Sequence, residues 1–114
     1  MALQEINVSY KQKPGYLTIP VDWSHSGIVS SGDMEALIRR KDLGGEVVFK
    51  VTTPLRGFDD IWKKVLLKFA EESKLGDAEV TINDNNATPF VVAARLRQML
   101  KEAVANAVAK ANGE

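Results

Sequence analysis

The residues of this chain best suited to chemistry are two adjacent hydroxyls in a short segment bounded by glycines. Residues 27–35 read Gly-Ile-Val-Ser-Ser-Gly-Asp-Met-Glu, so Ser30 and Ser31 stand directly before Gly32 and Asp33. Gly32 can adopt a positive φ at little cost, as tight turns often require. An exposed serine on such a turn could carry a covalently attached group. The residue types alone leave open whether it is only an ordinary turn residue.

The other side chains offer little alternative chemistry. The chain has no cysteine and one histidine. Asp22, Ser24 and His25 are close in sequence, but the members of a catalytic triad must converge from different elements, which near neighbours do not do. We therefore interpret His25 as a surface loop residue and expect no catalytic residue. Any thiol chemistry must come from an imported group.

Two polar segments resemble binding motifs without meeting their requirements. Asp-Asn-Asn at 84–86 is similar to the start of a calcium loop, but Pro89 and Arg95 occupy the positions where that loop needs glycine and glutamate. We expect 84–86 to end a strand and to lead into a helix cap, and we predict no metal site. The Arg-Arg-Lys run at 39–41 lies about 25 to 30 Å from the serines along an extended strand, at ~3.3 Å per residue. It is interpreted as a solvated strand end.

Composition narrows the class of protein. The 114 residues are 45% hydrophobic, which suits a single small domain spanning 1–114. Basic and acidic side chains number 15 each, so the basic excess expected of a nucleic-acid-binding protein is absent. No apolar run approaches the ~20 residues of a membrane span, and the N-terminus does not resemble a signal peptide. We expect a cytoplasmic protein with neither nucleic acid nor membrane as a partner.

The strands that must position the serines are predicted from alternating apolar residues. Two short strands, 27–29 and 34–38, are expected to form a hairpin around the serine turn. A Pro- and Gly-containing stretch at about 12–26 is expected to be an irregular connection. The other expected strands share the same period-two pattern or are rich in β-branched residues, and they cover 5–11, 46–53 and 77–84.

Two segments instead follow the helical period. Apolar residues from Phe58 to Ala70 predict a helix over 59–74 with Gly76 as its C-terminal cap, and we assign Phe58, Trp62 and Phe69 to the core rather than to a ligand pocket. Thr88 and Pro89 predict the start of a second, long helix. The fold class is therefore α+β, a mostly antiparallel β-sheet with two long helices packed on one face.

Three groups of residues, in matching order and spacing, resemble one known family. They are the segment 27–35, then Val-Thr-Thr at 51–53 with Gly57, Phe58 and Trp62, and finally Ile-Asn-Asp at 82–84 with Ala-Thr-Pro at 87–89 and Val-Val at 91–92. The chain resembles the acyl carrier (delta) subunit of malonate decarboxylase over about three-quarters of its length.

The resemblance implies a carrier with a covalent arm. The family's modified serine maps onto Ser31, which would bear 2'-(5''-phosphoribosyl)-3'-dephospho-CoA through a phosphodiester, with Gly32 and Asp33 supporting the turn. The terminal thiol of the arm would carry acetyl or malonyl groups as thioesters. Asp33 would either orient the turn or the incoming nucleophile, or bond to its own backbone.

The same resemblance implies a non-catalytic subunit with several partners. These are a transferase subunit that exchanges acetyl for malonyl, decarboxylase subunits that release carbon dioxide, the transferase that attaches the prosthetic group, and a malonyl-loading acyltransferase. Tethering would raise the effective concentration of the thioester at each partner.

Three features depart from the family pattern. Ser30 stands where members commonly have glycine, and it adds a second hydroxyl beside the expected site. Asn85 and Asn86 stand where a glycine is typical, although asparagine tolerates a left-handed backbone better than most residues. The stretch 13–22 is longer than usual.

Two alternative functions remain open at the level of sequence. A citrate lyase gamma subunit uses the same prosthetic group on a similar serine turn. From a different class, the chain could be an unmodified interaction module whose sheet edge docks a larger partner. An independent small enzyme is ranked last, because the sequence shows no convergent titratable residues.

Overall fold

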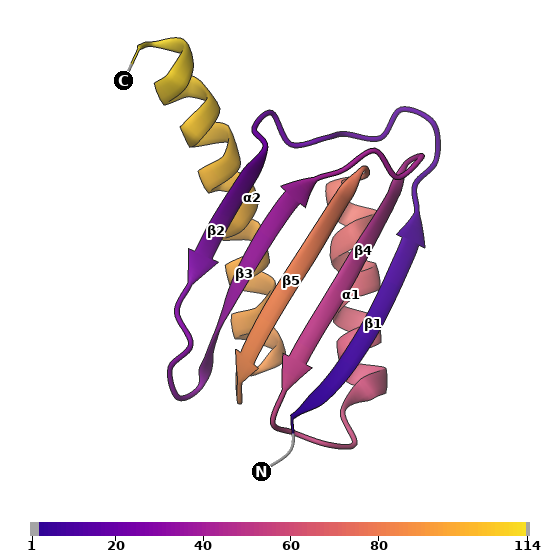
Figure 1. Cartoon of the computed structure of the whole chain (residues 1–114). Coiled ribbons are helices and arrows are strands. Elements are labelled where there is room, and N and C mark those ends of the chain that lie inside the picture. The colour runs from indigo at the N-terminus through magenta and orange to yellow at the C-terminus, as the bar shows by residue number, and fades with distance from the viewer. Residues whose placement is uncertain (1–2, 114) are drawn as a thin grey trace.

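The computed structural model describes residues 3–113, which form five strands and two helices in one α+β arrangement (Figure 1). The predicted fold class is confirmed. In chain order the elements are β1 (Gln4–Lys11), β2 (Trp23–Gly27), β3 (Asp33–Arg40), β4 (Glu46–Thr53), α1 (Asp59–Ser73), β5 (Ala78–Asn85) and α2 (Pro89–Ala111).

The strands form one sheet in the order β1-β4-β5-β3-β2. Neighbours pair antiparallel except β4 and β5, which are parallel. The parallel pair follows from connectivity, because the chain crosses from β4 to β5 through α1, and such a crossover returns the next strand in the same direction. β5 therefore lies between the β1–β4 pair and the β2–β3 pair and joins them.

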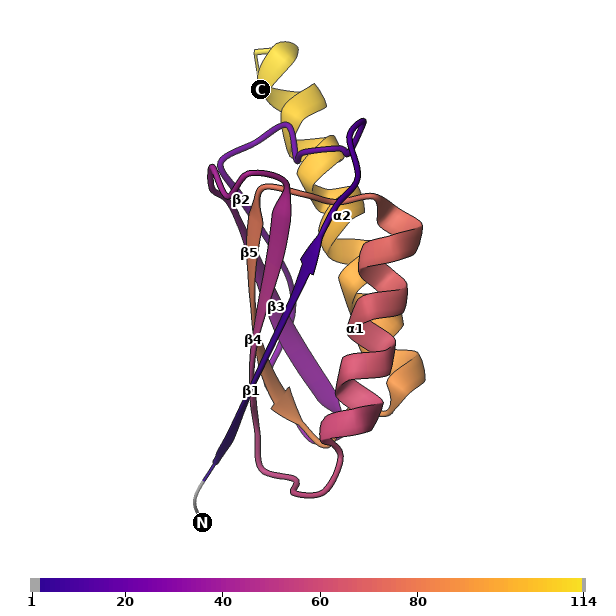
Figure 2. The same cartoon turned by 90° about the vertical axis from the view of Figure 1, so that its right-hand side faces the viewer.

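Both helices cover the same face of the sheet, and the other face carries no element among the described residues (Figure 2). The core lies between the two layers. In each strand, every second side chain points into this core, for example Val47, Phe49 and Val51 of β4. From α1, Trp62, Leu66 and Phe69 point into the core, and the ring of Phe69 meets that of Phe49 edge-on with centroids 6.2 Å apart.

The hairpin forms, but its first strand lies earlier than expected. The pair is β2 with β3, so the irregular connection ends at Asp22 and the loop covers residues 28–32. The pattern misled because the inward positions of β2 are Ser24 and Ser26, which are buried although polar. His25 accordingly lies on a strand rather than in a loop, with its side chain exposed.

Two expectations for α1 are also wrong. Its C-terminal cap is Lys74, which has φ +58 and donates its backbone N–H to the Ala70 carbonyl, and not Gly76. Gly76 is required for another reason, because a Cβ there would stand 2.5 Å from the Tyr16 ring. Phe58 is 42% exposed rather than buried in the core, and Ile61 on the same stripe is 45% exposed.

The long helix begins as predicted. Thr88 caps it by accepting a hydrogen bond from the Val91 N–H at 3.3 Å, and Pro89 is its first residue. Val92, Leu96 and Met99 are its main buried residues. Neither helix in residues 3–113 combines the length and the apolar character that a membrane crossing needs.

Gly27 ends β2 at a position that only glycine tolerates. Its φ is +80°, and a Cβ there would stand 2.1 Å from the Met34 carbonyl oxygen. We expect Gly27→Ala to lower the free energy of unfolding by at least 1–3 kcal/mol, the order of the cost of backbone strain alone. Urea unfolding followed by circular dichroism measures this loss.

Gly32→Ala is the matched control. Gly32 also has a positive φ, +75°, but a Cβ there would meet no atom within 4 Å. The control variant should lose only the free energy of unfolding that the strained backbone costs, about 1–2 kcal/mol. Equal losses for the two variants would contradict the clash at Gly27.

Candidate functional site

The two serines lie in the loop of residues 28–32 that joins β2 to β3. Ser31 is exposed, whereas Ser30 is only partly exposed. The Asp33 N–H donates to the Ser30 carbonyl at 3.0 Å, which closes a four-residue turn with Ser31 and Gly32 at its centre. Gly32 supplies the positive φ expected for the third position of a type II turn. The predicted tight turn is therefore present.

The loop is fastened to the centre of the sheet. The Gly32 N–H donates to the Asn85 carbonyl at the end of β5 with a length of 2.8 Å. The next residue, Asn86, has φ +66, so an asparagine does adopt the left-handed backbone expected where a glycine is typical. The loop that carries the serines and the loop that leads into α2 are thus joined directly.

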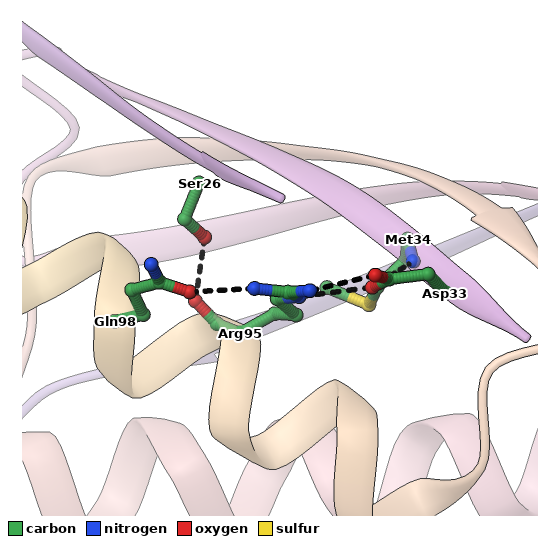
Figure 3. A network of polar contacts seen from close by, with 5 residues as sticks. All are labelled: Ser26, Asp33, Met34, Arg95 and Gln98. Atoms are coloured by element: carbon green, nitrogen blue, oxygen red, sulfur yellow. Dashed lines mark hydrogen bonds and ion pairs between the residues drawn. The ribbon is translucent and has the colours of Figure 1, made fainter. Parts of the chain in front are cut away.

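Asp33 fastens the other side of the turn to α2 (Figure 3). Its Oδ1 accepts from the Arg95 Nε at 2.9 Å and its Oδ2 accepts from the Arg95 Nη2 at 2.6 Å, a two-point ion pair. Oδ1 also accepts from the Met34 N–H at 2.7 Å. Arg95 is held in turn by Gln98, whose Oε1 accepts from Nη1. Asp33 therefore orients the turn and also makes a local backbone contact.

The ion pair controls the protonation of both partners. Hydrogen bonding from Arg95 is the main cause that lowers the pKa of Asp33, and the Met34 N–H adds to it. Asp33 in turn raises the pKa of Arg95. Both groups are thus charged at neutral pH, and the turn is held by opposite charges rather than by a neutral hydrogen bond.

Two buried serines join β2 to the same helix. Ser26 Oγ donates to the Arg95 carbonyl at 2.7 Å, and Ser24 Oγ donates to the Met99 carbonyl at 3.1 Å. Figure 3 shows the Ser26 bond beside the ion pair. Each hydroxyl is buried, but each has a carbonyl of the helix backbone as its hydrogen-bond acceptor, as buried polar groups require. The signal in the sequence that could have indicated these contacts is two serines two residues apart, the spacing that places both side chains on one face of a strand.

Other candidate residues take structural positions. Asp84 accepts from the Thr53 hydroxyl at 2.8 Å and from the Ala87 N–H at 2.9 Å, which confirms the predicted strand exit. Among the side chains of residues 3–113, no three His, Cys, Asp or Glu groups converge as metal ligands would. His25 Nε2 lies 3.2 Å from Glu35 on the open face of the sheet.

The basic run lies at the far end of β3. Arg40 pairs with Asp22 and Lys41 pairs with Glu79, at 2.8 and 3.0 Å. Arg40 is the last residue of β3 and Lys41 follows it, whereas Ser31 precedes the start of the strand, so the expectation that the basic run is remote from the serines is confirmed.

The surroundings of Ser31 fit an attached group. Its side chain is exposed, and a Cβ built on the neighbouring Gly32 meets open space. The backbone on both sides is nevertheless fixed, through Asn85 and Arg95. The geometry presents the Ser31 hydroxyl from a defined turn.

The profile of the family described as Malonate decarboxylase delta subunit (MdcD) matches residues 22–103, the span that contains β2 to β5 and most of α2. The chain belongs to this family. The match includes the serine turn, Asp33 and Arg95, so the site described above lies inside the family's shared region.

Relatives of the delta subunit family support the same assignment. The malonate decarboxylase acyl carrier protein of Malonomonas rubra is 45% identical over 102 residues, which is 89% of this chain and 89% of the relative. The protein of the same name from Xanthomonas campestris pv. campestris is 42% identical over 80 residues, or 70% of this chain and 76% of the relative. The family name thus agrees with the resemblance to malonate decarboxylase carriers and not with the citrate lyase alternative.

A solved structure shares the fold of this delta subunit family member. One chain in the crystal structure of a Pseudomonas malonate decarboxylase hetero-tetramer in complex with malonate matches with a TM-score of 0.70 and 26% identity. The match covers 90% of this chain and 99% of that one.

The Asp33–Arg95 pair predicts an acid dependence of stability. The pKa of Asp33 is lowered in the folded chain, so the pair stabilises the fold above the unfolded value of about 3.9 and loses this contribution as pH falls through the folded pKa. We expect Arg95→Met to raise the pKa of Asp33 toward its ordinary value. Carbon-detected NMR titration of the Asp33 carboxyl measures the shift.

Lys101→Met serves as the control for that titration. Lys101 is an exposed cation on the same helix, and none of the ion pairs found in residues 3–113 includes it. An Asp33 titration curve that is the same in Arg95→Met and in the unmodified sequence would disprove the electrostatic role of the pair.

Proposed function

We propose that this chain is an acyl carrier subunit that works within a malonate decarboxylase complex, with Ser31 as the point of attachment for its arm. The observation that carries the proposal is the exposed Ser31 hydroxyl on a turn fixed from both sides, in a chain of this family. The arm is 2'-(5''-phosphoribosyl)-3'-dephospho-CoA, joined through a phosphodiester. Its thiol supplies the group that holds acetyl or malonyl as a thioester.

Ser31 is favoured over Ser30 by the surroundings of the two residues. Ser30 is partly buried, and both its N–H and its carbonyl serve the turn, through Ile28 and Asp33. Ser31 is exposed and stands at the centre of the turn. A modifying enzyme therefore reaches the Ser31 oxygen without opening the loop. Gly32 permits the backbone shape, and Asp33 holds its direction.

The proposed role of the protein part is to present and to position, not to catalyse. The chain contributes no cysteine, and its one histidine is paired with Glu35 on the open sheet face. On this proposal, the reacting groups come from partners. We propose four of these: the transferase subunit that exchanges acetyl for malonyl, the decarboxylase subunits, the transferase that attaches the arm, and a malonyl-loading acyltransferase.

The rigid turn supports this division of labour. Holding the attachment point still confines the reach of the arm to one region, which raises the effective concentration of its thioester at a docked partner. A mobile loop would spread the arm over a larger volume and would lower that effective concentration. The bonds to Asn85 and Arg95 thus serve transfer although they touch no reacting atom.

The test is the mass of the protein produced together with the attaching transferase. We expect an increase equal to the phosphoribosyl-dephospho-CoA group, located by peptide mapping across residues 27–39. Ser31→Ala should fold, with a free energy of unfolding within about 0.5 kcal/mol of the original, because it alters an exposed turn residue. It should gain no mass.

Ser30→Ala is the control, and it should be modified normally. Added mass on Ser31→Ala, or its loss in Ser30→Ala alone, would move the attachment to Ser30. An unmodified protein from cells growing on malonate would favour the interaction module instead.

A further inference from the structure

A second feature lies at the same end of the domain as the serine loop. It is a hollow of about 270 Å³ between the first turns of α1, the start of α2 and the connections that precede them. Its lining is mainly apolar, and the residues that matter below are Leu55, Phe58, Ile61, Trp62, Val65 and Val92. We call it the end hollow.

The end hollow is directly connected to the attachment turn. Asn85, whose carbonyl accepts from the Gly32 N–H, is followed at once by Asn86, Ala87 and Thr88, which line the hollow. The segment that fixes the serine turn is therefore also the edge of the hollow. A group tethered at Ser31 starts from beside this edge.

Phe58, at the edge of the hollow, is an unusual residue for its position in the chain. It is the N-cap residue of α1, where Ser, Thr, Asp or Asn is strongly preferred, and it makes no side-chain capping bond. Its ring is instead 42% exposed at the hollow. The start of α2, by contrast, has an ordinary threonine cap. Positions where a local preference is not followed are expected to be functional or strained sites, so Phe58 is a candidate contact for a ligand of the hollow.

The chemistry of the lining limits what the hollow can bind. It contains no Lys or Arg, and the one carboxylate, Asp84, already accepts from Thr53 and Ala87. An uncharged and slender apolar group fits it. The larger groove of about 610 Å³ between α1 and α2 suits such a group less, because Lys68, Arg97 and Lys101 line it.

We propose that the end hollow binds the thiol end of the arm carried by Ser31, and that it shelters the thiol or its acetyl group between visits to partner subunits. This inference rests on the proposed function of Ser31. Phe58 and Ile61 provide the apolar contacts at the mouth of the hollow, and Trp62 forms part of its wall.

The absence of cysteine makes this shelter measurable. The sequence has none, so the only thiol of the modified protein is that of the arm. We would produce the full chain with the attaching transferase and follow its alkylation by iodoacetamide, in which the thiolate displaces iodide, by intact mass. The rate is multiplied by the fraction of time that the thiol is exposed, so shelter for about two-thirds of the time slows it about threefold relative to free dephospho-CoA.

Matched variants separate shelter from general stability. Phe58→Ser and Ile61→Asp should bring the alkylation rate to that of free dephospho-CoA. Phe58→Ser also places a hydroxyl at the cap of α1, so its melting temperature should not fall. Phe90→Ser is the control, because Phe90 is also an exposed phenylalanine at the start of a helix but lies outside the end hollow. It should keep the slow rate.

Three results would overturn the inference. A modified protein that reacts as fast as free dephospho-CoA has no shelter. Equal alkylation rates in Phe58→Ser and Phe90→Ser would show that the end hollow does not shelter the thiol. If Phe58→Ser also weakened copurification with the decarboxylase subunits, the hollow would be a docking site for a partner. A protein with no added mass before alkylation refutes the attachment itself, so failure of the proposed function is distinguished from failure of the shelter.

Discussion

The fold depends on β5 occupying the centre of the sheet, because among the described strands this one joins the β1–β4 pair to the β2–β3 pair. Without it, β1–β4 and β2–β3 would be two-stranded ribbons, which are marginally stable in water. Its inward residues Val80 and Ile82 are fully buried in the core. Its last residue, Asn85, holds the serine turn. Stability and the presentation of the site therefore rest on one strand.

The second helix is aligned on the hairpin by directional contacts rather than by apolar packing alone. Ser24 and Ser26 bond to carbonyls of α2, and Asp33 pairs with Arg95. Apolar burial has no direction, so it would allow the helix to slide or rotate by small amounts. Hydrogen bonds with fixed partners do not allow this. The edge of the sheet that bears the loop is thus set in one register against the helix.

Most of the fold could be predicted from the sequence, because strands such as 46–53 and both helices carry strong periodic patterns. β2 could not, since buried serines at Ser24 and Ser26 look polar in sequence and become inward residues only when α2 offers its carbonyls. The turn around Ser31 could be predicted from Gly32. The Asp33–Arg95 pair could not, because nothing local indicates that two residues so far apart in the chain will meet. The burial of Phe58 was wrongly predicted for a similar reason. The spacing of apolar residues predicts which side chains share a helix face, but not whether another element covers that face.

The bond from Gly32 to Asn85 also sets an order of events during synthesis. The hairpin that bears Ser31 leaves the ribosome long before β5, yet the turn acquires its carbonyl partner only when β5 inserts between β3 and β4. Long-range pairing of this kind forms late, because it must first close a large loop of chain. Until β5 is in place, the turn has only its local bond from the Asp33 N–H to the Ser30 carbonyl. The finished shape of the turn therefore reports that the whole sheet has assembled.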